Sequence, residues 1–144
     1  MTEPAATPTP ARAAARRFSR FELVELLGRS ERTMAWRAHD PRVGQDLIIV
    51  MPRSQLADGE ATSQWEHAAR KAARLNHPNL AHVVEVGVHE HWPFVTYDPQ
   101  GASTLAVQLG QQGLPGREAA QLISYAGQGL AYAHEAGAVH GDIQ

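Results

Sequence analysis

A chain of 144 residues with a formal net charge of −2 can bury one hydrophobic core, and it has no excess of positive charge to attract nucleic acid. It contains no cysteine, which excludes disulfide bonds and thiolate metal sites and fits a reducing cytoplasm. No apolar run approaches the roughly 20 residues of a membrane-spanning helix, and the apolar core of a signal peptide is missing. We therefore expect a cytoplasmic globular chain that contains no membrane segment and binds no nucleic acid.

The N-terminal stretch is rich in Ala, Pro and Thr and ends in a small basic cluster, with the sequence MTEPAATPTPARAAARR. Such a composition cannot bury a core, so we predict a disordered leader over residues 1–18. A helical basic anchor over Ala11–Arg17 is the alternative interpretation of the same residues.

Five segments have the pattern of β-strands, because each is short, rich in apolar or β-branched residues and bounded by residues that favour turns. In chain order they are Phe21–Leu27, Thr33–His39, Asp46–Met51, His82–Val88 and Pro93–Tyr97. Short loops join the first three, which favours an antiparallel meander.

Helical spacing appears between the third and fourth strands, over Thr62–Leu75. After residue 98, Ser103 is placed to cap a short helix that reaches about Gln112. A longer helix, Arg117–Glu135, follows a Pro-Gly entrance. Its apolar stripe consists of Leu122, Ala126, Leu130 and Ala133.

The order of these elements, together with three short stretches, resembles a protein kinase domain. The stretches are Ala73–Leu80 (ARLNHPNL), Gly129–His134 (GLAYAH) and His140–Gln144 (HGDIQ), the last standing where kinases have H-R-D-x-K. Gly137 is placed to take the left-handed position just after a helix. From about Phe21 to Gln144 the chain resembles bacterial Ser/Thr protein kinases.

The resemblance implies an α+β fold. A kinase-like N-lobe over residues 19–98 would contain a five-stranded antiparallel sheet with one main helix. A linker and a truncated C-lobe with its first two helices would occupy residues 99–144, ending in the catalytic-type loop. Because the rest of a C-lobe would be missing, we expect marginal stability or self-association through Arg117–Glu135.

In the kinase family, the Asp of this loop accepts the proton of the substrate hydroxyl, and Asp142 has that position beside His140. Gly141 replaces the family's Arg, and Gln144 replaces the Lys. The family's magnesium-binding Asn and its D-F-G motif would lie beyond Gln144.

Kinases grip the ATP phosphates with a glycine-rich loop, G-x-G-x-x-G-x-V, between the first two strands. Gly28, Ser30, Thr33 and Ala35 stand at these positions, so only the first glycine is kept. ATP and Mg²⁺ are the ligands that the resemblance implies. A plain hairpin loop is the alternative to a nucleotide-binding loop.

The family's strand Lys, which pairs with a helix Glu and the phosphates, is absent. Two registers are open, and they put Ile49 or Val50 at the Lys position. Lys71 is the only lysine in the chain and falls on the predicted helix. Counting back from the His-Pro pair puts Ala68 at the Glu position, so the ion pair is lost on both sides.

These losses predict a pseudokinase, a regulatory or scaffolding module that binds a protein partner and holds nucleotide weakly or not at all. The alternative is an atypical active Ser/Thr kinase, which would transfer the ATP γ-phosphate with Arg29, Arg32 or Arg53 as a substitute cation. A small interaction domain unrelated to kinases would require a different sheet topology. We expect no metal site, because the close pairs His89–His91 and His140–Asp142 have no third ligand in the sequence pattern.

Overall fold

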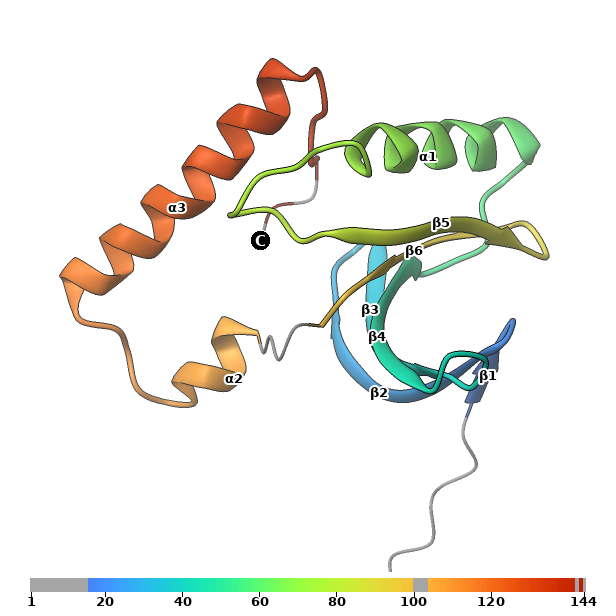
Figure 1. Cartoon of the computed structure of the whole chain (residues 1–144), viewed down its shortest axis with the longest axis horizontal. Helices are drawn as coiled ribbons and strands as arrows, with labels where there is room; N and C mark the ends of the chain where they lie inside the picture. Colours follow the sequence, from blue (N-terminus) through green and yellow to red (C-terminus); the bar gives the residue numbers. More distant parts are fainter. Residues whose placement is uncertain (1–15, 100–103, 142, 144) are drawn as a thin grey trace, which may run out of the picture.

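The computed structural model describes residues 16–99, 104–141 and 143 (Figure 1). A curled antiparallel sheet forms one part of the molecule, with one helix against it, and two further helices follow the sheet in the chain. The prediction of a disordered leader falls mostly on residues 1–15, which lie outside the described residues. Ser103, Asp142 and Gln144 also lie outside them.

The six strands of the sheet are ordered β1-β2-β3-β4-β6-β5. They are β1 (Arg16–Phe18), β2 (Phe21–Arg29), β3 (Thr33–Asp40), β4 (Gln45–Pro52), β5 (Val83–His89) and β6 (Trp92–Tyr97). The helices are α1 (Gly59–Ala72), which contacts β5 and β6, α2 (Leu105–Leu109) and α3 (Gly116–Glu135). In the described ranges, none of these helices has the length and apolar character that crossing a bilayer requires. The predicted α+β class and the predicted order of elements are confirmed.

β1 is a strand that the sequence pattern does not predict, because its residues belong to the basic end of the leader. Arg17 pairs with Glu22 across the turn, and their side chains form an ion pair at 3.5 Å. The Phe18 ring stands edge-on to the Phe94 ring, with 5.6 Å between centroids. The sheet therefore has six strands where five are predicted, and Arg16–Phe18 belong to it.

The hydrophobic core lies on the inner face of the curled sheet. Its buried members are Phe21, Ala38, Leu47, Ile49, Met51 and Phe94. In β4, the alternation of Leu47, Ile49 and Met51 sends every second side chain into this core. The Phe94 ring also meets the Phe21 ring edge-on at 5.6 Å, so aromatic packing joins β6 to β2.

A partly buried ion network joins three parts of the sheet that are distant in the sequence. Arg20 Nε donates to Asp40 Oδ2 at 2.8 Å, and the Arg20 guanidinium also forms hydrogen bonds with both carboxylate oxygens of Glu85. Burial opposes ionisation of Asp40, but hydrogen bonds from Arg20 and from the Arg42 N–H outweigh it, so the pKa of Asp40 lies below its ordinary value. The network links the β1–β2 turn, the end of β3, and β5.

Two helix starts differ from the sequence prediction, each because of a capping side chain. α1 begins at Gly59, three residues before the predicted start, because Asp58 Oδ1 accepts the Ala61 N–H at 2.8 Å. The cap of α2 is Thr104, whose Oγ1 accepts the Val107 N–H at 3.3 Å. The prediction of Ser103 as the cap of this helix is therefore wrong by one residue.

α3 lies against the loop that connects α1 to β5. A Cβ atom added to Gly129 would lie 2.9 Å from the backbone oxygen of Asn79 and 3.2 Å from Leu80 Cδ2. The rings of His77 and Tyr132 lie 5.2 Å apart between centroids. Two of the stretches that carry the kinase resemblance are therefore in direct contact.

The apolar stripe of α3 is covered only in its C-terminal half. Ala133 is buried and Leu130 is half-buried, whereas Leu122 is 42% exposed. The neighbouring Ile123 is 73% exposed. The expectation of self-association through this helix stays a prediction.

Replacement of Gly129 by Ala should destabilise the chain by about 1–3 kcal/mol, because the added methyl group meets a backbone oxygen that cannot rotate away. Gly127 is a matched control, since a Cβ there meets nothing within 4 Å. Gly127→Ala should stabilise by about 0.5–1 kcal/mol through helix propensity. Urea unfolding of the two variants measures both changes, and equal effects would contradict the close contact.

Replacement of Asp40 by Asn should destabilise the chain by about 1–3 kcal/mol at pH 7, because Arg20 then faces a neutral partner. Since the pKa of Asp40 is lowered by folding, its contribution is complete above the ordinary value of 3.8 and is lost as the pH falls through the folded value. The difference in the free energy of unfolding between the wild type and Asp40→Asn should therefore become smaller below about pH 4. Urea unfolding of both proteins at pH 7 and pH 3 measures this difference.

The control for this prediction is Asp46→Asn, which lies beside the same turn on the partner strand β4. Asp46 is exposed and contacts His39 Nδ1 at 2.8 Å, so its removal should have a much smaller effect. If the difference in the free energy of unfolding between the wild type and Asp40→Asn does not change with pH, the assigned role of the Asp40 charge is wrong.

Candidate functional site

The loop at the glycine-rich position is a tight hairpin that is closed by its own serine. The Ser30 N–H donates to the Thr33 carbonyl at 2.9 Å. Ser30 Oγ accepts the N–H groups of Arg32 and Thr33 at 3.0 and 2.9 Å, and it lies 3.1 Å from Thr33 Oγ1. The Arg32 and Thr33 amides are thus used inside the loop. In a phosphate-gripping loop, amides of this kind point at the ligand.

Arg53 supports the same hairpin from the end of β4. Its Nη1 donates to the Ser30 carbonyl at 3.0 Å, and its backbone N–H donates to the Arg32 carbonyl at 2.9 Å. The Arg53 guanidinium therefore binds the loop backbone, and a role as a substitute cation for the Lys stays a prediction. Arg29 and Arg32 are exposed.

The sheet register decides which residue stands at the position of the family's Lys. Gly28 pairs with Ala35, Ala35 with Val50, and Val50 with Val95. Directly paired residues of neighbouring strands project from the same face of a sheet. Val50 therefore shares its face with Gly28 and Ala35, while Ile49 is fully buried in the core on the other face. Val50 holds the Lys position, and no charge stands there.

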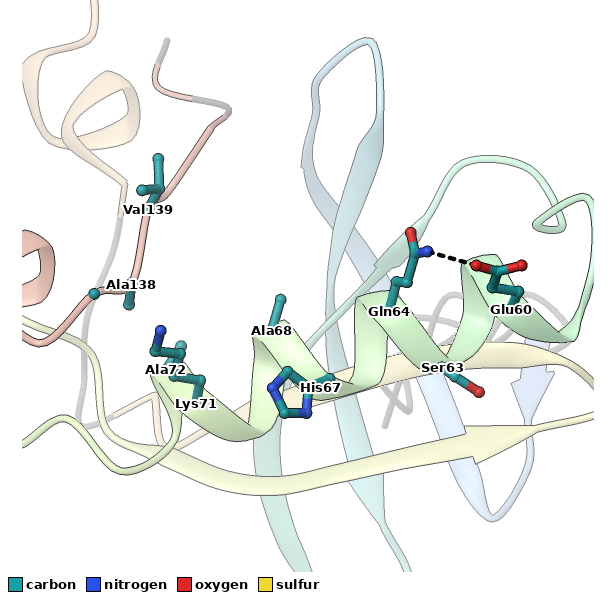
Figure 2. A pocket seen from close by; sticks show the side chains of 10 residues that line it. Glu60, Ser63, Gln64, His67, Ala68, Lys71, Ala72, Ala138 and Val139 are labelled. Atoms are coloured by element: carbon teal, nitrogen blue, oxygen red, sulfur yellow. Dashed lines mark hydrogen bonds between the residues drawn. The ribbon is translucent and has the colours of Figure 1, made fainter.

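Ala68 lies on the side of α1 that lines a cavity of about 680 Å³ between α1 and the segment after α3 (Figure 2). Lys71 and Val139 line the same cavity. Glu66, the nearest acidic residue in the sequence, does not line it and instead holds Arg70 in a hydrogen-bonded ion pair along the helix. Both halves of the family's Lys–Glu pair are therefore absent from these positions.

The segment that leads to the catalytic-type loop begins at the C-terminal cap of α3. The Gly137 N–H donates to the His134 carbonyl at 2.8 Å and the Ala138 N–H donates to the Ala133 carbonyl at 2.8 Å, which is the Schellman pattern. Gly137 has a φ of +73°, so the predicted left-handed glycine is confirmed. His140 is exposed. Asp142 lies outside the described residues, and its role stays a prediction.

The residues present do not fit a bound triphosphate. Val50 supplies no cation, and the amides of Arg32 and Thr33 are engaged by Ser30. Glu31 is exposed at the loop tip and adds negative charge there. Among the described residues, no three His, Asp or Glu side chains gather as a set that could hold a metal ion.

Sequence reasoning places Ser30 and Thr33 only as replacements for glycines and does not predict that Ser30 closes the loop. The available signal is the residue type, because a serine hydroxyl in a short loop tends to accept backbone N–H groups two or three residues further along the chain. Gly28 and Ala35 are paired across β2 and β3, and their assignment to a nucleotide site stays a prediction. Val95, which completes the row, carries no motif that marks it in the sequence.

No protein-family model matches the chain. The probable serine/threonine-protein kinase SCO3848 of Streptomyces coelicolor is 33% identical over 132 residues, which cover 87% of this chain and 20% of that protein. The serine/threonine-protein kinase PknF of Mycobacterium tuberculosis is 29% identical over 131 residues, which cover 88% of this chain and 28% of that protein. The chain thus spans between a fifth and a third of the length of these relatives.

A solved structure, the kinase domain of PknI from Mycobacterium tuberculosis, has the same fold, with a TM-score of 0.65 at 22% identity. The match covers 93% of this chain and 56% of that domain. The chain is therefore a homologue of the bacterial serine/threonine protein kinases, and it has the fold of the N-lobe and the start of the C-lobe.

Proposed function

We propose that the chain is the kinase-like part of a pseudokinase, a cytoplasmic signalling module that regulates or scaffolds a protein partner and does not transfer phosphate. The observation that carries the proposal is the row Gly28–Ala35–Val50–Val95, which puts an apolar side chain where a kinase needs its cation. This chain covers only 20% and 28% of the two relatives named above. Any function of a longer protein is therefore proposed from those relatives and not from this chain.

The glycine-loop geometry supports the same function independently. A loop whose amides donate to Ser30 has to break those hydrogen bonds before it can bind phosphate oxygens. Each such hydrogen bond has a net value of about 1 kcal/mol, which offsets part of what the same amide would gain from a phosphate oxygen. Nucleotide affinity is therefore reduced both by the missing charge and by the closed loop.

The loss of both ion-pair partners is physically consistent with retention of the fold. A lysine at position 50 without a carboxylate at position 68 would leave a charge beside the apolar row, which is costly. Val50 instead packs between the cross-strand neighbours Ala35 and Val95. With Val50 in place of a lysine, the sheet keeps its apolar packing but has no cation at this position to bind a phosphate group.

Titration of this chain with ATP, with and without Mg²⁺, tests the proposal by thermal unfolding. A ligand present at 100 times its dissociation constant stabilises the folded state by about 2.7 kcal/mol, so tight binding would give a clear shift. We expect no shift at millimolar nucleotide. A magnesium-dependent shift would favour the atypical active kinase.

The matched variant restores the two lost groups and opens the loop: Ser30→Gly, Val50→Lys and Ala68→Glu. We expect nucleotide-dependent stabilisation in this triple variant and not in the wild type. Phosphotransfer by the native protein, with Asp142→Asn as the control, tests activity directly. Turnover that depends on Asp142 would refute the pseudokinase.

Replacement of Ser30 by Ala should increase hydrogen exchange at the Arg32 and Thr33 amides by about ten-fold, because both lose their acceptor. Global stability should fall by no more than about 1 kcal/mol, since water reaches the loop tip. Ser54→Ala, at an exposed serine after β4, is the control and should leave both amides unchanged. Unchanged exchange in Ser30→Ala would contradict the closed loop.

A further inference from the structure

Three arginines gather on one face of the sheet, at the end where β2, β3 and β4 meet the closed loop. Arg29 pairs with Met34, and Met34 pairs with Met51 of β4. Arg32 comes two residues before Met34, and Arg53 comes two residues after Met51. Because side chains alternate between the two faces of a sheet, all three arginines project from the face that carries these methionines. We call Arg29, Arg32 and Arg53 the arginine patch.

The arginine patch lies on the opposite face from the apolar row that contains Val50. Ala35 follows Met34 in β3, and Val50 precedes Met51 in β4, so both residues of the row project from the other face. An anion that is held by the patch therefore lies away from the row, which stands where a kinase holds the phosphates of its nucleotide.

The arginine patch has no ion-pair partner among residues 16–99, 104–141 and 143, and its three members are exposed. Three other arginines on or beside the same strands form ion pairs, which are Arg17–Glu22, Arg20–Asp40 and Arg37–Glu25. The whole chain has a net charge of −2, so the patch is a local feature, and Glu31 in the loop offsets only part of its charge. Such a patch is complementary to an anionic ligand.

The loop holds the members of the patch close to one another. The Arg53 N–H donates to the Arg32 carbonyl at 2.9 Å, so these two arginines stand opposite each other across β3 and β4. Like charges in directly opposed positions destabilise a sheet. Arg53 Nη1 also donates to the Ser30 carbonyl at 3.0 Å, which leaves the other N–H groups of the guanidinium for an anion. Since the backbone of the loop is fixed in this way, less conformational entropy is lost when an anion binds.

We propose that the arginine patch is a docking surface for an acidic segment of a protein partner. A guanidinium binds a carboxylate through two parallel hydrogen bonds, and a bound carboxylate relieves the repulsion between Arg32 and Arg53. Leu26 pairs with Trp36 on the same face and is 42% exposed, so the patch has an apolar border that suits a protein segment. The docking surface rests on the proposed function in one respect, which is that the module binds a protein partner.

Fluorescence anisotropy of a labelled oligoglutamate peptide with the whole chain tests the docking surface at low ionic strength, where exposed charges are screened least. Arg29→Gln and Arg32→Gln should each weaken binding by about two- to five-fold, the size expected for one exposed ion pair. Arg32→Gln should also raise the midpoint of thermal unfolding by about 1–3 °C, because Arg53 loses the like charge opposite it. A lowered midpoint would show that Arg32 serves the fold and would overturn the proposal.

Arg37→Gln is the matched control, because Arg37 is an exposed arginine of the same hairpin that already has Glu25 as its partner at 2.8 Å. It removes the same charge and should leave the affinity for the peptide unchanged. Equal weakening in Arg37→Gln and Arg32→Gln would overturn the proposal, because the peptide would then respond to net charge alone. A wild-type chain that does not bind the peptide at low ionic strength would also overturn it.

Two competitors test the other possible occupants of the patch. Unlabelled oligoglutamate should displace the labelled peptide, whereas single-stranded oligothymidylate and ATP with Mg²⁺ should displace it far less. Equal displacement by oligothymidylate would assign the patch to nucleic acid, and equal displacement by ATP would assign it to nucleotide, so either result would overturn the proposal. Thermal stabilisation by ATP without displacement of the peptide would refute the pseudokinase and leave the docking surface in place.

Discussion

The close packing of α3 on the loop after α1 is the constraint on which the arrangement of the chain depends. Gly129 has no side chain, so the backbone of α3 comes directly against the Asn79 carbonyl. The tilted ring contact between His77 and Tyr132 adds a second contact about one helical turn away. α1 is in turn fixed against β5 and β6, so these contacts place α3, and the segment that follows it, relative to the sheet. The N-terminal half of α3 has no comparable contact among the described residues, as the exposure of Ile123 indicates.

The sheet provides the other half of the candidate site, and its curvature is held by groups far from that site. Arg20 joins Asp40 to Glu85 across the sheet, and its guanidinium lies 4.2 Å from the centroid of the Phe21 ring. Phe94 packs on Phe18 and Phe21 from inside the curl. These contacts do not involve the row that contains Val50. The fold therefore does not depend on a charged side chain in that row.

Most of the fold is predictable from the sequence because its elements have strong local patterns. The β-branched run of β4 and the helical spacing of α3 are examples, and Gly137 is predicted correctly from its place after a helix. β1 is not predictable in this way, since Arg16 and Arg17 are basic and only the packing of Phe18 on Phe94 selects the strand. The choice between Ile49 and Val50 also needs the structure, because pairing register is a property of two strands and not of one.

The close approach at Gly129 and the closed loop at Ser30 show a further limit of sequence reasoning. Both depend on a neighbour that no periodicity identifies. Gly129 stands in a helix, where glycine costs about 1 kcal/mol, and only the Asn79 carbonyl explains it. Ser30 replaces a glycine at which the family's backbone meets phosphate, and its hydroxyl occupies the amides in place of a ligand. This geometry supports the proposed loss of phosphate binding, because the two amides would have to leave Ser30 before they could bind a phosphate oxygen. Val50 completes an apolar row on the adjoining strands, and together with the closed loop it supports the proposed pseudokinase, in which the surface of this region would serve partner binding and not phosphate transfer.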